Sequence, residues 1–590
     1  MSGTCLFVPD TRRAHGTGHI RRALRLCSSL NEAASVCLDF PWHGAVRTAD
    51  ESLALYDGTD ELTSIRWSEV GTVPTSCIIV DAQTANVSEI VQMLAVAPVV
   101  GIDLGGEGRS YASFLIDTMV NLEAHRPNIY APDALELPDR VRTEPPGPAP
   151  RALVCMGGDD IASLTEPLVA TLDRCKAVAA GSVDVVLSEA SLREGSPLPG
   201  RLAAYGVTDA IFSTNKLSAR LGRYDLVYCT FGLTAFEALA AGCTVCTLSP
   251  TDYHARLSRK AGLPLIDGTR VREVQDLMKR LDTIWRAQEA IRPVRRRSIA
   301  EIVRSFDPEG CVGEPSGGPA KTPVEVRLPE RSFRRESRSG LLYLERFHHL
   351  TIEYNDEYFD TAYEKQYGRT YLEDFDHIRA MGLRRLRNIR ALRGSDGGVL
   401  LDIGCAYGPF LSAANAQGYT CVGMDIFEGA TSYVRETLGI SAFTGRATEL
   451  SRSSAHELRD GADVITMWYV IEHIDRLDRM FEGVLDLLKQ GGVLAFSTPN
   501  GHGVSGRRDM RSFLERSPED HRTIWTPKSA RRYLKNLGFT AIQIRVTGHH
   551  PERISSTLAR FAVGRRCLQL YSRVLGLGDT FEVYARRGRT

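Results

Sequence analysis

One histidine near the start of the chain follows a turn that could bring it to a ligand. Residues 14–26 read AHGTGHIRRALRL, in which His19 comes after two glycines and before a basic segment with helical leucine spacing. A turn that only bends the backbone is served by any small polar residue, whereas an imidazole exchanges a proton near neutral pH. His19 is therefore a candidate general base, and a hydrogen-bonding role that shapes the turn is the alternative.

Two later turns offer backbone N–H groups to a phosphate. CMGGDD at 155–160 follows an apolar strand-like run, and TFGLTAFEALAAGC at 230–243 begins a helix after Gly232. Helix starts bind phosphate oxygens through free amides and the positive end of the helix. Glu237, one turn into this apolar helix, is costly to bury unless its carboxylate meets a specific group, although capping of the helix start would also account for it.

The stretch VLLDIGCAYGPFLSAANAQGYTCVGMDIF at 399–427 carries the strongest signal in the chain. It is typical of a buried strand, a glycine-rich turn, a helix and a second strand that ends in Asp425. Such a turn lets a ligand approach the backbone, and an acid at the end of the second strand accepts both hydroxyls of a ribose. A dehydrogenase is the rival interpretation, but the GxGxxG fingerprint is absent.

Several α/β domains must position these residues, since a chain of 590 residues is too long to fold around a single hydrophobic core. Strand-like and helical segments alternate throughout, with interruptions by TEPPGPAP and by a Gly- and Pro-rich stretch. The expected parts are Rossmann-like domains at 1–143 and 150–290, a linker at 300–335 and a third domain at 341–590. The apolar run 226–248 is long enough for a membrane span, but its central glutamate and its glycines predict strand, helix and strand.

Composition restricts the partners and the compartment. The chain has 72 basic and 72 acidic residues, a balance that does not favour nucleic acid. The first residues lack the apolar core of a secretory signal, so we expect a cytoplasmic protein with no integral membrane segment and with its thirteen cysteines reduced. The CxxC pair Cys243 and Cys246 lies in an apolar run without a second pair, and no metal site is expected. The oligomeric state is left open.

The C-terminal motifs resemble those of class I S-adenosylmethionine-dependent methyltransferases, in particular the ubiquinone-type O-methyltransferases. The resemblance spans 354–548 and rests on DIGCAYG, GMDI, ADVITMWYVIEHIDR, KQGGVLAFSTPN and HRTIWTPKSARRYLKNLGF. It implies a seven-stranded doubly wound sheet and S-adenosylmethionine as cofactor. The residues that it places around the cofactor are Asp402, Gly404 and Gly408 at the methionine part, Asp425 at the ribose, and Cys405, Ile426 and Trp468 beside them.

Methyl transfer needs orientation above all, and a base only where the acceptor is a hydroxyl. His473, His502 and His521 are the candidates for that base. His473 could instead pack at the start of its helix, and His502 lies in a glycine-rich loop where exposure to solvent accounts for it. The sequence departs from the family in two places: Ala406 replaces the usual middle glycine, and the acid that often meets the adenine has no clear counterpart in FTGRATEL.

GTGHIRR at 16–22, CMGGDD and TFGLTAFEALAAGC together resemble the nucleotide-sugar hydrolase that releases UDP in pseudaminic acid biosynthesis. The wider relatives are GT-B glycosyltransferases, with two facing Rossmann-like domains. The resemblance implies that His19 activates water or an acceptor hydroxyl. It also implies a UDP-sugar site made by Gly16, Gly18, Arg22, Gly157, Gly158, Gly232, Leu233, Thr234 and Glu237. Asp103 is the single acid where the hydrolase has a pair.

The sequence thus predicts an α/β enzyme in which a GT-B-like pair of domains precedes a methyltransferase domain. We expect S-adenosylmethionine-dependent methyl transfer, to oxygen, fused to a UDP-sugar hydrolase or glycosyltransferase-like unit of nucleotide-sugar or surface-glycan biosynthesis. The expected substrate is a small molecule, either a UDP-sugar or a glycan precursor. The alternative is a methyltransferase whose N-terminal half only binds the nucleotide sugar or glycan.

Overall fold

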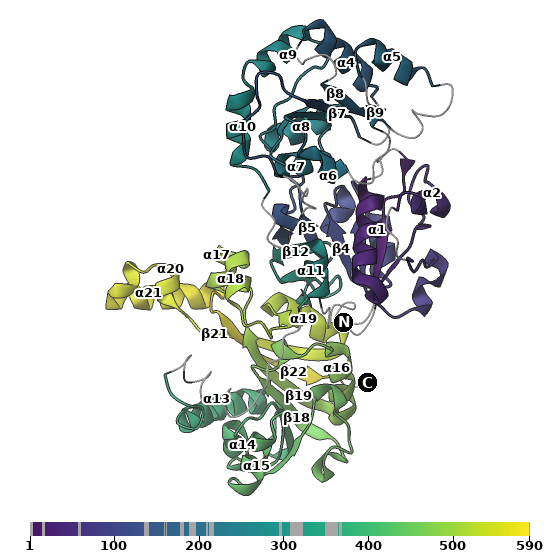
Figure 1. Cartoon of the computed structure of the whole chain (residues 1–590). Coiled ribbons are helices and arrows are strands. Elements are labelled where there is room, and N and C mark those ends of the chain that lie inside the picture. The colour runs from purple at the N-terminus through teal and green to yellow at the C-terminus, as the bar shows by residue number, and fades with distance from the viewer. Residues whose placement is uncertain are drawn as a thin grey trace. The chain divides into compact units, whose positions relative to one another are not determined.

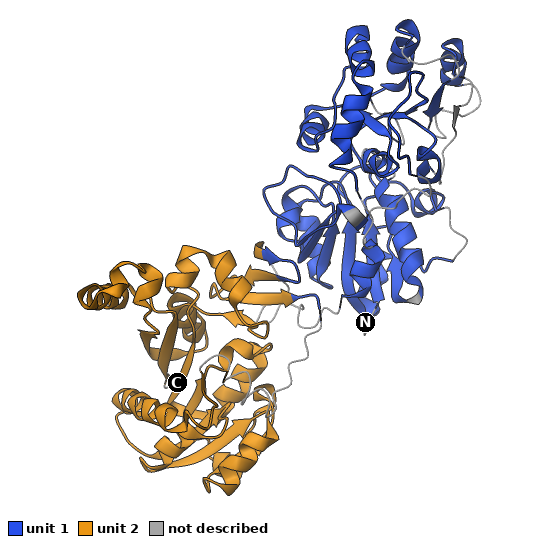
Figure 2. Ribbon diagram, turned by 60° about the vertical axis from the view of Figure 1, so that its left-hand side comes forward, with its two compact units in different colours: residues 1–311, 327–331, 346–348 blue, residues 312–326, 332–345, 349–590 orange. Residues whose placement is uncertain are grey.

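The computed structural model describes residues 4–13, 18–56, 61–134, 141–157, 160, 162–176, 182–187, 196–207, 210–211, 217–293, 298–306, 322–348, 364 and 368–588. The chain divides into two compact units, which Figure 2 shows in different colours. Unit 1 comprises residues 1–311, 327–331 and 346–348, and unit 2 comprises residues 312–326, 332–345 and 349–590.

Unit 1 contains a six-stranded parallel sheet in the order β2-β1-β3-β4-β5-β6. The strands are β1 Thr4–Pro9, β2 Ala34–Val36, β3 Thr75–Asp81, β4 Val99–Ile102, β5 Phe114–Asp117 and β6 Ile129–Tyr130. Their apolar runs are nearly continuous because helices cover both faces of the sheet. The helices α1 (Gly18–Leu30) and α11 (Ile299–Arg304) pack on one face, and α3 (Val87–Leu94) packs on the other.

The second sheet of unit 1 has five parallel strands in the order β11-β10-β7-β8-β9. The strands are β7 Ala152–Cys155, β8 Val183–Val186, β9 Ala210–Ile211, β10 Leu226–Cys229 and β11 Thr244–Thr247. The remaining helices of unit 1 are α2 Ala49–Leu53, α4 Thr165–Arg174, α5 Leu198–Ala204, α6 Leu217–Leu221, α7 Leu233–Ala240, α8 Asp252–Lys260, α9 Val271–Met278 and α10 Leu281–Glu289. The run 226–248 is β10, α7 and β11, which confirms the prediction of strand, helix and strand.

Unit 2 is built on a seven-stranded sheet in the order β17-β16-β15-β18-β19-β22-β21 (Figure 1). The strands are β15 Gly398–Ile403, β16 Tyr419–Asp425, β17 Ser441–Thr444, β18 Ala462–Trp468, β19 Leu488–Pro499, β21 Phe539–Thr547 and β22 Thr580–Arg587. β22 runs antiparallel to both of its neighbours, and the other pairs are parallel. Apolar clusters lie on both faces, so the predicted seven-stranded doubly wound sheet is confirmed.

Helices of unit 2 alternate with these strands and begin at clear local signals. They are α13 Phe375–Arg393, α14 Pro409–Asn415, α15 Glu428–Glu436, α16 Leu477–Leu487, α17 Val504–Arg508, α18 Met510–Arg516, α19 Pro527–Asn536, α20 Pro551–Ile554 and α21 Ala562–Leu575. In α19 the Thr526 side chain accepts the N–H of Ser529 and proline follows as the first helical residue, which is a favourable helix start. No helix of the described ranges combines the length and the hydropathy that a membrane crossing requires.

The expected linker at 300–335 needs correction, because its described residues are folded. The end of α11 lies there, as do β12 (Val324–Leu328) and β13 (Arg331–Arg335), which form a four-stranded sheet with β14 (Leu342–Arg346) and β20 (Thr523–Ile524). These strands contain buried arginines, so a hydropathy pattern does not identify them as buried strands. Arg334 is fully buried and pairs with Glu345 at 3.0 Å, and Arg327 donates to the carbonyl of Ala112 at 2.7 Å. The stretch 307–321 lies outside the described residues.

Candidate functional site

The glycine-rich turn after β15 packs closely against neighbouring side chains. Gly404 and Gly408 have φ angles of +72° and +79°, which glycine adopts without strain. A Cβ on Gly404 would lie 2.3 Å from Val470, and one on Gly408 would lie 2.8 Å from a leucine side chain. Ala406, in the place of the family's middle glycine, also has a positive φ of +46°, and its N–H donates to Asp425 Oδ2 at 2.9 Å.

Two buried carboxylates lie at the ends of β15 and β16. Asp425 Oδ1 accepts the N–H of Phe427 at 3.0 Å, and further lone pairs of the carboxylate can accept ligand hydroxyls. Burial raises the pKa of Asp425, against the lowering effect of its backbone donors. Asp402 accepts a hydrogen bond of 2.6 Å from Thr466, and burial raises the pKa of Asp402 to about 8. A bound cation nearby would favour its ionised form.

The other residues predicted at the cofactor lie around this edge of the sheet. Trp468 ends β18, and the guanidinium of Arg385 lies 4.0 Å from the centroid of its ring. Ile426 follows Asp425 and is half exposed, so its side chain is accessible to a ligand. The Cys405 side chain is part of the core, and burial raises the pKa of its thiol. Cys405 can therefore contribute its backbone, but not a thiolate, to a site.

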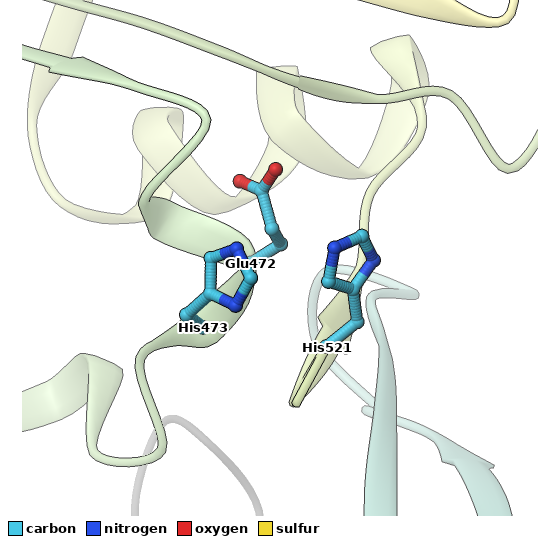
Figure 3. A group of neighbouring side chains, drawn as sticks. All are labelled: Glu472, His473 and His521. Atoms are coloured by element: carbon cyan, nitrogen blue, oxygen red, sulfur yellow. The ribbon is translucent and has the colours of Figure 1, made fainter. Parts of the chain in front are cut away.

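Two of the predicted histidines lie together with an acidic residue beyond the end of β18. Figure 3 shows Glu472 and His473 on a short 3-10 helix, Ile471–His473, with His521 beside them. The two imidazole centroids are 4.8 Å apart with the rings edge to face. His473 Nδ1 lies 2.9 Å from Asp520 Oδ2. This contact engages Nδ1, so a role of His473 as a base would use its other ring nitrogen, Nε2.

Burial and neighbouring charges shift the pKa values of two members of this group. Burial alone would lower the pKa of His473, but the hydrogen bond to Asp520 and the negative charge of Glu472 outweigh it and raise the pKa. Burial raises the pKa of Glu472 to about 7. Ligand atoms of Glu472, His473 and His521 all lie within 4.8 Å of one another, so they could also hold a metal ion. That no metal is used stays a prediction.

His19 in unit 1 has a carboxylate partner. It lies in the first turn of α1, and its Nδ1 is 2.5 Å from Asp81 Oδ1 at the end of β3. Arg22 donates twice to Asp81 and once to Asp103, at 2.6 to 2.8 Å. Burial would raise the pKa of Asp81, but Arg22 and His19 outweigh it and lower the pKa. The Asp81 carboxylate thus orients the His19 imidazole through Nδ1. A role of His19 as a general base would use Nε2.

The residues predicted to bind the nucleotide sugar belong to both sheets of unit 1. Gly157 follows β7 with a φ of +82°, and Gly232 precedes α7, which begins with Leu233 and Thr234. A Cβ on Gly18 would lie 3.6 Å from Leu233 Cδ1, so the starts of α1 and α7 are neighbours. Glu237 is half-buried one turn into α7. Arg22 faces Asp81 and Asp103, which makes it a positioning residue. Gly16 and Gly158 lie outside the described residues.

Comparisons with known proteins address the second unit. Residues 375–544 match the family model of a methyltransferase domain. The ubiquinone biosynthesis O-methyltransferase of Azoarcus sp. (strain BH72) is 25% identical over 186 residues, which cover 30% of this chain and 79% of the relative. That of Aliivibrio fischeri (strain MJ11) is 27% identical over 184 residues, covering 29% and 74%. A solved SAM-dependent methyltransferase from Archaeoglobus fulgidus is 18% identical, with a TM-score of 0.29, and covers 38% of this chain and 98% of that one.

Unit 2 contains a class I methyltransferase domain. Its cofactor is S-adenosylmethionine, and the residues of the turn fit that group. Gly404 and Gly408 take the positive φ angles that the turn requires, the Asp425 carboxylate can accept hydroxyls, and a positive charge nearby would favour the ionised form of Asp402, whose pKa burial raises. Which side chains contact the cofactor stays a prediction.

Three side chains of the methyltransferase domain escaped the sequence analysis. Asp520 precedes His521 in the chain but pairs with His473, far away in sequence, and no local pattern announces such a pairing. Arg385, whose guanidinium lies over Trp468, belongs to an arginine-rich helix that appears solvated from its spacing. For Glu472 a local signal exists, because it is an acid that directly follows the apolar run MWYVI and precedes His473.

The third histidine predicted for the methyltransferase domain has different surroundings. His502 lies in the turn after β19, where its backbone N–H donates to Asn500 Oδ1 at 3.0 Å. Burial and the positive charge of Arg507 lower the pKa of His502. Among the described residues it does not belong to the group formed by Glu472, His473 and His521.

Proposed function

We propose that the methyltransferase domain transfers the methyl group of S-adenosylmethionine to a hydroxyl oxygen of a small molecule. The observation that carries this proposal is the contact of His473 with Asp520. A hydroxyl becomes a strong nucleophile only as its proton leaves, and an imidazole oriented by a carboxylate is suited to accept that proton. Oxygen as the acceptor atom agrees with the O-methyltransferases among the relatives.

The domain's own residues divide the work of this reaction. S-adenosylmethionine supplies an electrophilic methyl group on a sulfonium. Asp425 at the end of β16 would hold the ribose hydroxyls, and the turn from Gly404 to Gly408 would lie beside the methionine part of the cofactor. His473 accepts the hydroxyl proton on Nε2 while Asp520 stabilises the imidazolium through Nδ1. The protein then contributes chiefly the alignment of acceptor oxygen and methyl carbon.

Intact-mass screening tests the proposal most directly. The full-length protein is incubated with S-adenosylmethionine and a pool of nucleotide sugars and glycan precursors, and a gain of one methyl identifies the acceptor. His473→Asn in the same pool is the matched control. A methylated product whose new methyl resides on nitrogen or carbon, or undiminished product from His473→Asn, would overturn the proposed chemistry.

A second activity is favoured in unit 1 by the short contact between His19 and Asp81. We propose that unit 1 binds a UDP-sugar in a GT-B-like site and that His19 activates water or an acceptor hydroxyl toward the anomeric carbon. The protein would then act in nucleotide-sugar or surface-glycan biosynthesis. The alternative is a non-catalytic unit that presents the nucleotide sugar or glycan to the methyltransferase domain. Release of UDP supports catalysis, and binding without release supports the module.

A further inference from the structure

The helix α21 presents its apolar side away from the protein. Ser572 is its single buried residue, and Ser572 Oγ contacts His549 Nδ1 at 2.7 Å. The apolar residues Val563, Cys567, Leu570, Tyr571 and Val574 recur at intervals of three and four, and all five are exposed. In an α-helix this spacing places them on one face, opposite Ser572. In Figure 1, α20 and α21 project from the seven-stranded sheet of unit 2.

This face stands out from the rest of the described chain. Of the four large apolar side chains with the greatest exposure among the described residues, three belong to this face: Val574 at 76%, Val563 at 74% and Leu570 at 65%. By contrast, the apolar face of α16 in the same domain is buried in the hydrophobic core. Contiguous exposed apolar surface marks an interaction site in soluble proteins, whereas single exposed residues need no explanation.

Charge identifies the kind of surface that would cover this face. Between residues 551 and 575 the chain has five arginines and one acidic residue. Arg566 and Arg573 are exposed and lie seven residues apart, on one flank of the apolar face. In an antiparallel pair of α21 helices these two arginines would meet their own copies, and like charges in contact repel. A negatively charged surface would instead be attracted.

We propose that α21 lies flat in the interface of an anionic lipid bilayer, with its apolar face against the acyl chains. Helices that bind in this way combine an apolar face with Lys or Arg beside it, as α21 does. Tyr571 supplies an aromatic ring on this face, and tyrosine is favoured at the boundary between headgroups and acyl chains. Each arginine near an anionic surface adds attraction that falls with salt. This proposal is independent of the reaction that the methyltransferase domain performs.

Co-sedimentation of the full-length protein with vesicles tests the proposal. Phosphatidylcholine vesicles with and without phosphatidylglycerol are compared at low and high salt. We expect binding to the anionic vesicles, weakened by salt, and a reduction of about tenfold or more in Leu570→Gln/Val574→Gln and in Arg566→Glu/Arg573→Glu. The matched controls Leu383→Gln and Arg384→Glu change exposed residues of α13 and should bind as the parent does.

Three results would overturn the proposal. The parent protein could fail to bind anionic vesicles, or both α21 variants could bind them as well as the parent does. The parent could also form a dimer that Leu570→Gln/Val574→Gln abolishes while vesicle binding is absent, which would assign the face to a second copy of the chain. Thermal melting of every variant verifies folding. Because all six substituted side chains, four in α21 and two in α13, are exposed, unfolding is not expected.

Discussion

Replacing Asp425 by Asn should weaken the binding of S-adenosylmethionine without weakening the fold. The substitution removes the negative charge and one of two acceptor oxygens at the end of β16. Hydrogen bonds to charged groups contribute about 1.5–3 kcal/mol each. The loss of one such bond to the ribose corresponds to a dissociation constant higher by about 10- to 150-fold.

The same carboxylate predicts the behaviour of the protein without cofactor. Because burial raises the pKa of Asp425, the folded state binds its proton more tightly than the unfolded state does. Its contribution to stability is therefore present at low pH and is lost as the pH rises through the raised pKa. At neutral pH the neutral Asn should leave the melting temperature of the apoprotein equal to that of the parent or higher.

Isothermal titration calorimetry of the full-length protein measures the affinity, and a thermal melt without cofactor measures the fold. Asp486→Asn is the matched control, since Asp486 is an exposed aspartate of α16 that pairs with Arg452. An unchanged dissociation constant in folded Asp425→Asn would refute the assignment of this carboxylate to the ribose. A melting temperature several degrees below that of the parent would show that the hydrogen bonds of Asp425 with backbone amides contribute more to stability than burial of the carboxylate costs.

Four further results are expected. His473→Asn should lower kcat by about 10²–10⁴ with little change in cofactor affinity; an unaffected kcat excludes it as the base. The active imidazole is neutral, so kcat should rise with pH through the raised pKa of His473, and Asp520→Asn should move this rise to lower pH; an unmoved profile contradicts the pairing. Chelation by EDTA should leave the rate of methyl transfer unchanged; a loss of activity that an added divalent cation restores would show that the domain uses a metal. His19→Asn should slow UDP release and spare binding, whereas Glu237→Gln should weaken UDP-sugar binding first; equal effects on both quantities would exclude these separate roles.

Features set by neighbouring residues were predictable from the sequence. The strands and turn of 399–427 follow from short apolar runs around a glycine turn, and Asp425 ends β16, as the pattern predicts. The run 226–248 was likewise resolved into strand, helix and strand by Gly232 and Glu237. In these segments the local pattern and the tertiary structure favour the same conformation.

Features set by pairing across the chain were not predictable. The strands β12 and β13 contain arginines that hydropathy assigns to the surface, yet Arg334 is buried because Glu345 on another strand neutralises it. Asp520 acquires its importance from His473, on a different element. The apolar face of α21 has ordinary amphipathic spacing, and the spacing alone cannot tell which side of a helix the protein covers.

The threading of the chain through its two units affects any attempt to take them apart. In order along the chain, the segments alternate between unit 1 and unit 2, so that residues 327–331 and 346–348 return to unit 1 after the first segment of unit 2. No single cut can therefore yield one fragment with all of unit 1 and another with all of unit 2. Genetic dissection or recombination of the two halves must move the hairpin strands β12 to β14 as one block.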